Sequence, residues 1–288
     1  MEEPLFRPPA EADSLILQVD RGCPYNRCSF CGMYSGVRFR RLKLPEIATL
    51  LARAAHHGAR RVFLADGDVL RRPFAELSAI LKLLGERLPD LARVNVYATG
   101  SAIAEKSDEQ LRALRGLKLH TLYLGLESGD EAVLKSMRKA ESAELMARES
   151  LRAQACALHL SVMVLLGLGG KAHSAQHVRA SASALNRMQP RLLSALRVIP
   201  VPGTGLMRDI EAGRFAELSE YEAVAELRAL LAKLELSRTV FRANHASNVV
   251  PLEGALPRDK ARLLAELDAL LESGGLDRDS PGPAPLAL

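Results

Sequence analysis

Short apolar runs alternate with amphipathic ones along nearly the whole chain, and this rhythm limits the fold more than any other feature of the sequence. The apolar runs predict seven strands, at Leu15–Val19, Arg61–Ala65, Val94–Ala98, His120–Leu124, Leu160–Leu166, Leu192–Val198 and Thr239–Arg242. Strands that begin roughly 25 to 45 residues apart, with a helix in each gap, indicate βα repeats and a parallel sheet. Most of these runs are apolar throughout, as expected for strands covered on both faces.

The segments between the strands carry helical patterns and helix-start signals. Helices are predicted at Pro45–His57, Arg72–Arg87, Ala143–Leu158, Ser174–Met188 and Pro257–Leu271. Three serines are each followed three residues later by Gln or Glu, which is typical of a capping box that opens a helix. These serines are Ser107, Ser128 and Ser219.

Six βα units, a seventh strand and a closing helix fit a partial (β/α)6-type TIM barrel with a C-terminal extension. A doubly wound open sheet fits the same periodicity, and both remain open at this point. We expect an N-terminal extension over residues 1–13 and one domain over residues 14–273. Residues 274–288 are rich in Gly, Pro and Asp, which predicts a disordered tail.

Composition argues against several classes of function. The net charge of +5 is only mildly basic, and the absence of Trp, with 4% aromatic residues, argues against a nucleic-acid partner. No apolar run is long enough to span a bilayer, so no membrane association is expected. The start of the chain is acidic and Pro-rich, unlike a secretory signal, and we expect a cytoplasmic protein.

Three of the four cysteines, Cys23, Cys28 and Cys31, lie together directly after the first predicted strand. The carboxyl ends of parallel strands carry the active site in α/β folds, so the three thiols stand where catalysis is expected. Such a cluster in a chain with few cysteines indicates a metal or catalytic site rather than a disulfide framework. Three thiolates suit a four-iron cluster that keeps one iron open for another ligand.

Two other metal sites share parts of this pattern. A structural zinc site usually has four protein ligands, and a distant His would have to complete it. The C-x4-C-x2-C spacing also matches plant-type ferredoxins, which need a fourth Cys. Cys156 lies far along the chain in a helical pattern and is interpreted as a small buried hydrophobe. A non-catalytic iron–sulfur or zinc-binding α/β protein is therefore the alternative to an enzyme.

The run Gly22-Cys23-Pro24-Tyr25, and Phe30 just before the last cysteine, resemble the radical S-adenosylmethionine (SAM) superfamily. Four residues separate the first two cysteines, whereas most members have three. The resemblance extends from about Ser14 to Leu271 and looks closest to a bacterial subgroup with Cys-Pro-(Tyr/His)-Asn-Arg-Cys, Gly-Leu-Glu-Ser-Gly and His-Ala-Ser-Asn motifs. It implies a partial barrel with one [4Fe-4S] cluster on the three cysteines.

The resemblance also implies the chemistry. SAM would bind the open iron, and reductive cleavage would release a 5′-deoxyadenosyl radical that takes hydrogen from an unidentified substrate. An electron donor such as flavodoxin or ferredoxin is the expected partner. The SAM-contacting residues that it implies are Phe30, Asp66, Gly67, Asp68, Glu127, Ser128, Arg148, Gly167 and Gly169.

Each of these residues has a place in the implied site and also an ordinary structural explanation. Asp66 and Gly67 follow the second strand, where the family binds the amino group of SAM. Glu127 would take the ribose hydroxyls, and Ser128 would contact the SAM carboxylate or only cap a helix. The glycines after the fifth strand would pack on adenine, and Arg148 would reach the SAM carboxylate or lie on a solvated helix face.

The segment after the seventh strand, Asn244-His245-Ala246-Ser247-Asn248, is polar without the composition of a simple turn. We predict that His245 and Asn248 bind substrate or transfer protons, facing the same cavity as the cysteines. A turn network that seals the barrel is the alternative. The rigid turn from Pro200 to Thr204 would form a wall for adenine or substrate, and the basic run from Arg38 to Lys43 most simply forms a solvated face.

Overall fold

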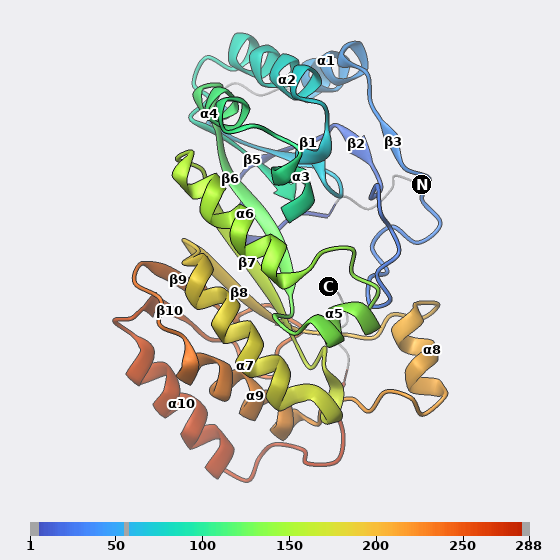
Figure 1. The fold of residues 1–288 in the computed structure, drawn as a ribbon, viewed down its shortest axis with the longest axis vertical. Coiled ribbons are helices and arrows are strands. Elements are labelled where there is room, and N and C mark those ends of the chain that lie inside the picture. Colours follow the sequence, from blue (N-terminus) through green and yellow to red (C-terminus); the bar gives the residue numbers. More distant parts are fainter. Residues whose placement is uncertain (1–5, 55–57, 284–288) are drawn as a thin grey trace. The chain divides into compact units, whose positions relative to one another are not determined.

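The computed structural model describes residues 6–54 and 58–283, drawn as a ribbon in Figure 1. Within these residues the fold is α/β, and the larger of two sheets has eight strands. The region expected to form one domain, residues 14–273, divides between two compact units. The first unit comprises the described residues of Met1–Asn26, Met33–Leu124 and Arg148–Leu160, and the second those of Arg27–Gly32, Gly125–Ala147 and Ser161–Leu288.

The first unit is built on four parallel strands. Their order in the sheet is β1 (Leu15–Gln18), β4 (Arg61–Ala65), β5 (Arg93–Ala98) and β6 (Leu119–Glu127). The helical segments are η1 (Pro9–Glu11), α1 (Leu44–Arg53), η2 (Val69–Arg71), α2 (Phe74–Arg87), α3 (Gly100–Ala104) and α4 (Asp108–Gly116), and α2 contacts both α1 and α4. A two-stranded antiparallel ribbon, β2 (Asp20–Arg21) with β3 (Arg40–Arg41), flanks the cysteine loop. The last predicted residues of the first helix, 55–57, lie outside the described part of the chain.

The second unit contains most of the remaining elements. Strands β7 (His159–Leu166), β8 (Leu192–Arg197) and β9 (Thr239–Arg242) run parallel, and β10 (Glu253–Leu256) pairs antiparallel with β9. The helices that follow β6 are α5 (Glu131–Ser136), α6 (Ala143–Ala155), α7 (Gly170–Met188), α8 (Gly205–Glu211), α9 (Glu220–Lys233) and α10 (Lys260–Glu272). Helix α9 lies between α7 and α10 (Figure 1).

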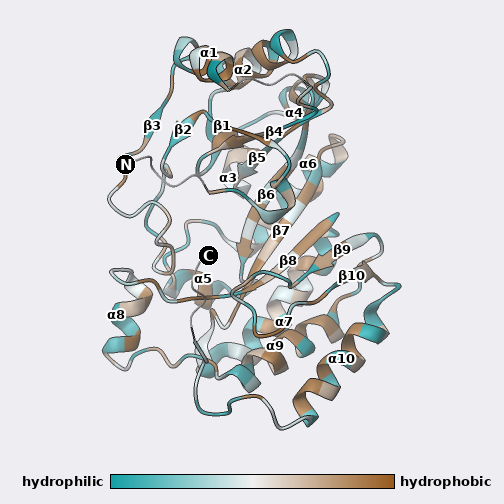
Figure 2. Cartoon of the chain, turned by 180° about the vertical axis from the view of Figure 1, so that it is seen from behind, coloured by the Kyte–Doolittle hydropathy of each residue, from teal (hydrophilic) through white to brown (hydrophobic). Residues whose placement is uncertain are grey.

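The apolar runs of the sequence form the buried layer. Figure 2 shows the apolar residues of β7 and β8, and β7 is buried at Val162, Val164 and Leu166. All seven predicted strands are present as β1, β4, β5, β6, β7, β8 and β9, with ends that differ by a few residues. The capping boxes predicted at Ser107 and Ser219 open α4 and α9. Helices lie in the gaps between these parallel strands, which confirms the α/β parallel class.

Both ends of the described chain are tied to the fold. Glu11, in the expected N-terminal extension, is buried, and its carboxylate accepts a hydrogen bond from Asn95 on β5 (2.8 Å). The composition after residue 273 predicts disorder, but the structure has this segment bonded to α9 as far as it is described. The Glu220 N–H donates to the carbonyl of Ser280 (2.9 Å), and the Arg278 guanidinium lies 3.9 Å from the Tyr221 ring centroid. This segment has few apolar side chains, and backbone hydrogen bonds to the first residues of α9 hold it instead. Residues 284–288 lie outside the described chain.

Within the described residues, no helix combines the length and the apolar character needed to cross a membrane.

Candidate functional site

The cysteine loop begins in the first unit, and a buried ion pair holds its start. Asp20 and Arg72 are 1% and 2% exposed, and the Asp20 carboxylate lies 2.7 Å from Arg72 Nη2. The same nitrogen donates to the carbonyls of Val19 (2.6 Å) and Leu42 (2.9 Å). Burial raises the pKa of Asp20 to about 6, although Arg72 acts in the opposite direction. One buried guanidinium therefore joins the residue after β1, the ribbon strand β2 and the residue after β3.

The turn after β4 lies directly against Cys23, whose thiol is free and partly exposed. A Cβ placed on Gly67 would lie 2.6 Å from the Cα of Cys23 and 2.7 Å from the carbonyl oxygen of Gly22. Only glycine allows this approach of two backbones. The Gly67 N–H donates to the hydroxyl of Tyr34 (3.2 Å). Gly67, predicted from its place after a strand, thus shapes the position of Cys23.

The two aspartates beside Gly67 are buried and bonded to the protein. The Asp66 carboxylate accepts the Gly22 N–H of the cysteine loop (3.1 Å). The Asp68 carboxylate accepts from the Thr99 hydroxyl (2.7 Å) and lies 3.2 Å from Nε of Arg71. Asp66 therefore supports the loop that carries Cys23, and Asp68 ties the same turn to the start of α3.

The second half of the loop, with Cys28 and Cys31, belongs to the second unit and is held by two helices. The Ser29 N–H donates to the carbonyl of Met137 after α5, and the Ser29 carbonyl accepts the Leu206 N–H from the first turn of α8; both distances are 2.8 Å. Phe30 packs against an apolar cluster formed by Val133, Met137, Leu165, Leu168 and Leu206. Neither cysteine is in a disulfide and both are partly exposed, so the loop is anchored while its thiols stay accessible.

Three partly exposed cysteines outside any disulfide match the donor set of an iron–sulfur cluster, whose usual protein ligands are Cys thiolates. In residues 6–54 and 58–283, no three His, Cys, Asp or Glu side chains are close enough together to hold one metal ion. Cys23 belongs to the first unit, and Cys28 and Cys31 belong to the second. The chemistry of the donors therefore fits a cluster.

Glu127, at the end of β6, has a φ of 60°, in the left-handed region that non-glycine residues rarely adopt. Its Oε1 lies 3.2 Å from Lys139 Nζ, and its buried Oε2 has no hydrogen-bond partner among the described residues. A Cβ on Gly125 would lie 1.9 Å from Oε1, so this carboxylate occupies space that only glycine leaves free. A buried oxygen with unused acceptor capacity suits a hydroxyl donor from a ligand.

Lys139, whose side chain is 12% exposed, is a cation that the sequence did not point to. Burial lowers its pKa, but the nearby Glu127 carboxylate and Cys28 thiol together raise it above its ordinary value. The ammonium thus stays charged beside the predicted ribose carboxylate and one predicted cluster ligand. A positive charge at this place favours a thiolate at Cys28.

The prediction that Ser128 caps α5 was wrong. Asp130 is the cap, because its carboxylate accepts the Val133 N–H (2.9 Å) and the helix begins at Glu131. The Ser128 hydroxyl is fully buried, accepts the Asp130 N–H (3.0 Å) and lies 2.8 Å from Nδ1 of His177 on α7. Ser128 is therefore part of a polar interior rather than of a helix start.

His177 continues this polar interior toward α9. Its Nε2 lies 3.8 Å from Oε1 of Glu226, and both side chains are at most 1% exposed. Glu226 in turn accepts the Gly167 N–H (2.6 Å) and the Ser174 hydroxyl. Burial raises the pKa of Glu226 to about 7, and burial lowers the pKa of His177 to about 4. We name Ser128, His177, Glu226 and Ser174 the buried relay.

The buried relay predicts opposite pH dependences for two variants. Glu226 has a raised pKa in the folded state, so its contribution to the free energy of unfolding increases as the pH falls from 7 to 4.5. His177 has a lowered pKa in the folded state, so its contribution decreases as the pH falls from 6.5 to 4. Each shift corresponds to about 3 kcal/mol. In chemical denaturation at several pH values, Glu226→Gln should lose about that free energy of unfolding on acidification, and His177→Gln should gain it. In the wild type the two contributions largely cancel, and equal slopes in all three proteins would contradict the assignment.

Gly167 and Gly169 follow β7 in a turn that needs both glycines. Gly167 has a φ of 79°, and a Cβ on Gly169 would lie 3.0 Å from the His173 backbone and 3.2 Å from the Cβ of His177. Gly169 is the residue before α7, so its small size lets the helix start close to the turn. The turn predicted to pack on adenine is thus fixed by α7 on one side and by Glu226 on the other.

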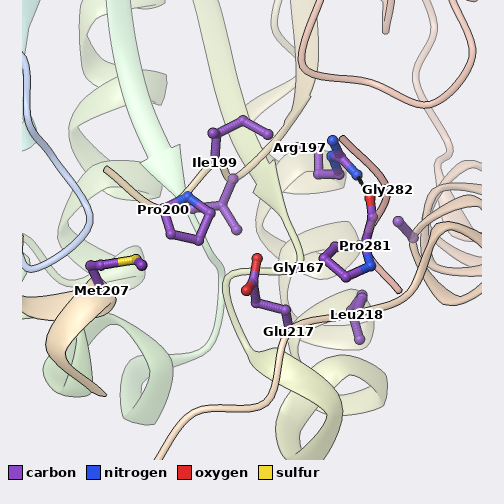
Figure 3. A pocket seen from close by; sticks show the side chains of 11 residues that line it. Gly167, Arg197, Ile199, Pro200, Met207, Glu217, Leu218, Pro281 and Gly282 are labelled. Carbon is purple, nitrogen blue, oxygen red and sulfur yellow. Dashed lines mark hydrogen bonds between the residues drawn. The ribbon is translucent and has the colours of Figure 1, made fainter. Parts of the chain in front are cut away.

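A cavity of about 210 Å³ opens in the second unit beside Gly167, where β7 and β8 end. Its wall includes Pro200, as expected for the turn after β8, and also Pro281 from the C-terminal segment. Figure 3 shows the carboxylate of Glu217 pointing into this cavity. The Arg197 guanidinium at its edge donates to the carbonyls of Ser247 (2.8 Å) and Pro281. The cavity therefore offers an apolar wall with one cation and one carboxylate.

The polar segment after β9 forms backbone-bonded turns. The Asn248 Oδ1 accepts the Arg197 N–H, and its Nδ2 donates to the carbonyls of Ala195 and Ala243; each distance is 2.8 Å. The Nδ1 of His245 accepts the Ser247 N–H (3.1 Å) and lies 2.9 Å from the Ser247 hydroxyl. These contacts favour the sealing-network alternative: Asn248 joins β8 to the end of β9, and His245 forms a local turn.

Arg148 lies on the exposed face of α6, where Nε pairs with Glu149 at 2.9 Å. The neighbouring Arg152 instead donates to the carbonyls of Ile103 and Lys106 (2.5 and 2.7 Å), which fastens α6 to the last turn of α3 and the residues that follow it. These contacts fit the solvated-face explanation for Arg148. Cys156, at the end of the same helix, is 2% exposed.

Several solved structures have a fold similar to that of this chain. Methylornithine synthase matches with a TM-score of 0.55 and 18% identity, over 89% of this chain and 81% of that chain. Coproporphyrinogen III oxidase from Escherichia coli, a radical SAM enzyme, matches with a TM-score of 0.53 and 15% identity, over 91% and 52% of the two chains. The radical SAM methyltransferase TsrM from Kitasatospora setae, with cobalamin and a [4Fe-4S] cluster bound, gives 0.53 and 18%, over 69% and 39%. At these identities the likeness concerns the fold alone, and it confirms the predicted partial-barrel class.

Sequence comparisons address the family. The chain is 29% identical over 141 residues to hopanoid C-2 methylase from Rhodopseudomonas palustris (strain TIE-1), a match that covers 47% of this chain and 26% of that protein. The match therefore spans only about a quarter of that relative. The family model described as the radical SAM superfamily matches residues 17–169, which include all three cysteines of the loop and the strand ends up to Gly169. Because this model covers more than half of the chain, the protein belongs to the radical SAM superfamily.

Proposed function

We propose that this enzyme binds a [4Fe-4S] cluster through Cys23, Cys28 and Cys31 and cleaves SAM reductively to act on an unidentified substrate. The observation that carries the proposal is the set of three partly exposed cysteines, none in a disulfide, in an anchored loop of a radical SAM domain. When bound, the cluster would supply the electron that splits the SAM sulfonium into methionine and a 5′-deoxyadenosyl radical.

The protein's own residues would bind and orient SAM. Glu127 has a buried acceptor oxygen for the ribose hydroxyls, and Lys139 balances the charge of that carboxylate. The Gly167 turn offers backbone for the adenine, next to the cavity that Pro200 lines. Phe30 would anchor the cysteine loop, because its ring packs against the apolar cluster. This anchoring would help to hold Cys28 and Cys31 in place for the iron–sulfur cluster.

Other predicted residues take supporting roles in this proposal. Asp66 and Gly67 hold the loop around Cys23, which leaves carbonyls of the same turn for the SAM amino group. Ser128 and Asn248 have interior partners and would act by positioning. We infer that the reductant is a small electron-transfer protein such as flavodoxin or ferredoxin, and that the enzyme acts in the cytoplasm.

The proposal is tested by anaerobic reconstitution of the full chain with iron and sulfide, followed by dithionite and SAM. We expect about four iron atoms per chain and formation of 5′-deoxyadenosine with methionine. One zinc and no iron after anaerobic purification, with no 5′-deoxyadenosine formed, would support the structural-zinc alternative. Iron loading without cleavage of SAM would support the non-catalytic iron–sulfur protein instead.

A further inference from the structure

The buried relay connects two turns that the proposed SAM site needs. At one end the Ser128 hydroxyl lies 2.8 Å from His177 Nδ1, directly after Glu127 in the chain. At the other end Glu226 accepts the Gly167 N–H at 2.6 Å. Between these ends, His177 and Glu226 project from α7 and α9, which pack against each other. The relay therefore extends from the residue after the predicted ribose carboxylate to the predicted adenine turn, and Ser128, His177 and Glu226 are buried.

The Glu226 carboxylate is buried, and its hydrogen-bond donors show which segments it contacts. A buried carboxylate costs free energy unless donors satisfy it. Its two hydrogen-bond donors are the Gly167 N–H and the Ser174 hydroxyl, the second from the first turns of α7. Gly167 lines the cavity and has a φ of 79°. Because glycine can adopt many backbone conformations, this turn could take several shapes. The hydrogen bond from the Gly167 N–H to the Glu226 carboxylate favours one of these conformations.

His177 supports this carboxylate from the opposite side. The Ser128 hydroxyl accepts the Asp130 N–H and also lies within hydrogen-bond distance of Nδ1 of His177. On the other side of the ring, Nε2 faces Glu226 Oε1 at 3.8 Å, which is beyond hydrogen-bond distance. The charged groups that face the pair are Asp130 beside His177 and Glu226 itself. The imidazole thus packs between the Ser128 turn and the carboxylate.

We propose that Glu226 and His177 are positioning residues that fix the Gly167 turn, and with it one wall of the cavity, for the nucleoside part of SAM. This inference rests on the function proposed above. Neither side chain reaches the cavity itself, since both are buried and Gly167 alone of the group lines it (Figure 3). Their effect on the ligand would therefore pass entirely through the backbone.

The test compares binding of S-adenosylhomocysteine to the cluster-loaded full chain and three variants by isothermal titration. Glu226→Gln keeps one acceptor but cannot accept from both donors as a carboxylate does, so we expect about tenfold weaker binding. Ser174→Ala removes one donor and retains the charge, and about threefold weaker binding is expected. Hydrogen exchange of the amides at 167–169 should quicken in both variants.

Leu230→Ala is the matched control, because Leu230 is buried on the same helix and lines no cavity. It should lower the melting temperature while leaving the dissociation constant and the exchange at 167–169 unchanged. Wild-type affinity in both Glu226→Gln and Ser174→Ala, or an equal loss in Leu230→Ala, would overturn the positioning role. If the wild type itself bound no S-adenosylhomocysteine and cleaved no SAM, the proposed function would fall, and this inference with it.

Discussion

Replacing Cys28 with alanine is expected to abolish reductive cleavage of SAM, with 5′-deoxyadenosine formation reduced by more than about a hundredfold. Changes to groups that merely orient metal ligands already cost 10 to 100-fold, so losing one of three ligands must cost more. The same result is expected for Cys23→Ala and Cys31→Ala. The measurement is anaerobic product formation with dithionite, together with iron content and the visible absorption of the cluster.

The fourth cysteine provides the matched control for this experiment. Cys156 is 2% exposed at the end of α6 and has no part in the loop. Cys156→Ala should retain the iron content and the rate of the wild type, with only a small loss of stability because the substitution deletes a single buried heavy atom, Sγ. Loss of iron in Cys156→Ala, with retention in Cys28→Ala, would place the cluster elsewhere.

Replacing Arg72 with leucine is expected to lower the free energy of unfolding by roughly 3 to 5 kcal/mol, the cost of leaving one member of a buried ion pair alone. Asp20 would keep a buried carboxylate without its cation, and the carbonyls of Val19 and Leu42 would lose a donor. Chemical denaturation at neutral pH measures the change. Because this guanidinium holds the start of the cysteine loop, iron loading should also fall.

An exposed ion pair provides the comparison. Arg40 pairs with Glu46 at 2.9 Å, and their side chains are 49% and 40% exposed. Arg40→Ala should cost less than about 1 kcal/mol, as exposed pairs usually do. Equal losses in Arg72→Leu and Arg40→Ala would mean that the buried pair does not organise the loop.

The strands could be predicted because each is a continuous apolar run, as β4 and β9 show with unchanged bounds. Strand β10 was missed because its four residues, Glu-Gly-Ala-Leu, have no β-branched side chain, and its pairing with β9 decides its conformation. The box expected at Ser128 failed because a second capping residue, Asp130, stands two positions later. Where two residues could each cap a helix, tertiary contacts decide which of them does so.

The cysteines and the strand-end glycines could be predicted because motif and position coincide in the sequence. His177 and Glu226 could not be, since they lie on two different helices, 49 residues apart, and neither belongs to a motif. Lys139 similarly follows a short helix and meets Glu127 only through the left-handed backbone at that residue. The polar groups that support a site from behind are placed by packing, which a single sequence does not reveal.

The C-terminal segment has a consequence for how cavities of this kind could diversify. Pro281 and Gly282 line the cavity but belong to no strand or helix, and they are held through backbone groups such as the Pro281 carbonyl on Arg197. Side chains in this segment can change without disturbing the sheet. Ligand preference could thus be retuned by substitutions in a stretch that contributes nothing to the hydrophobic core, leaving the cysteine loop and the parallel strands as they are.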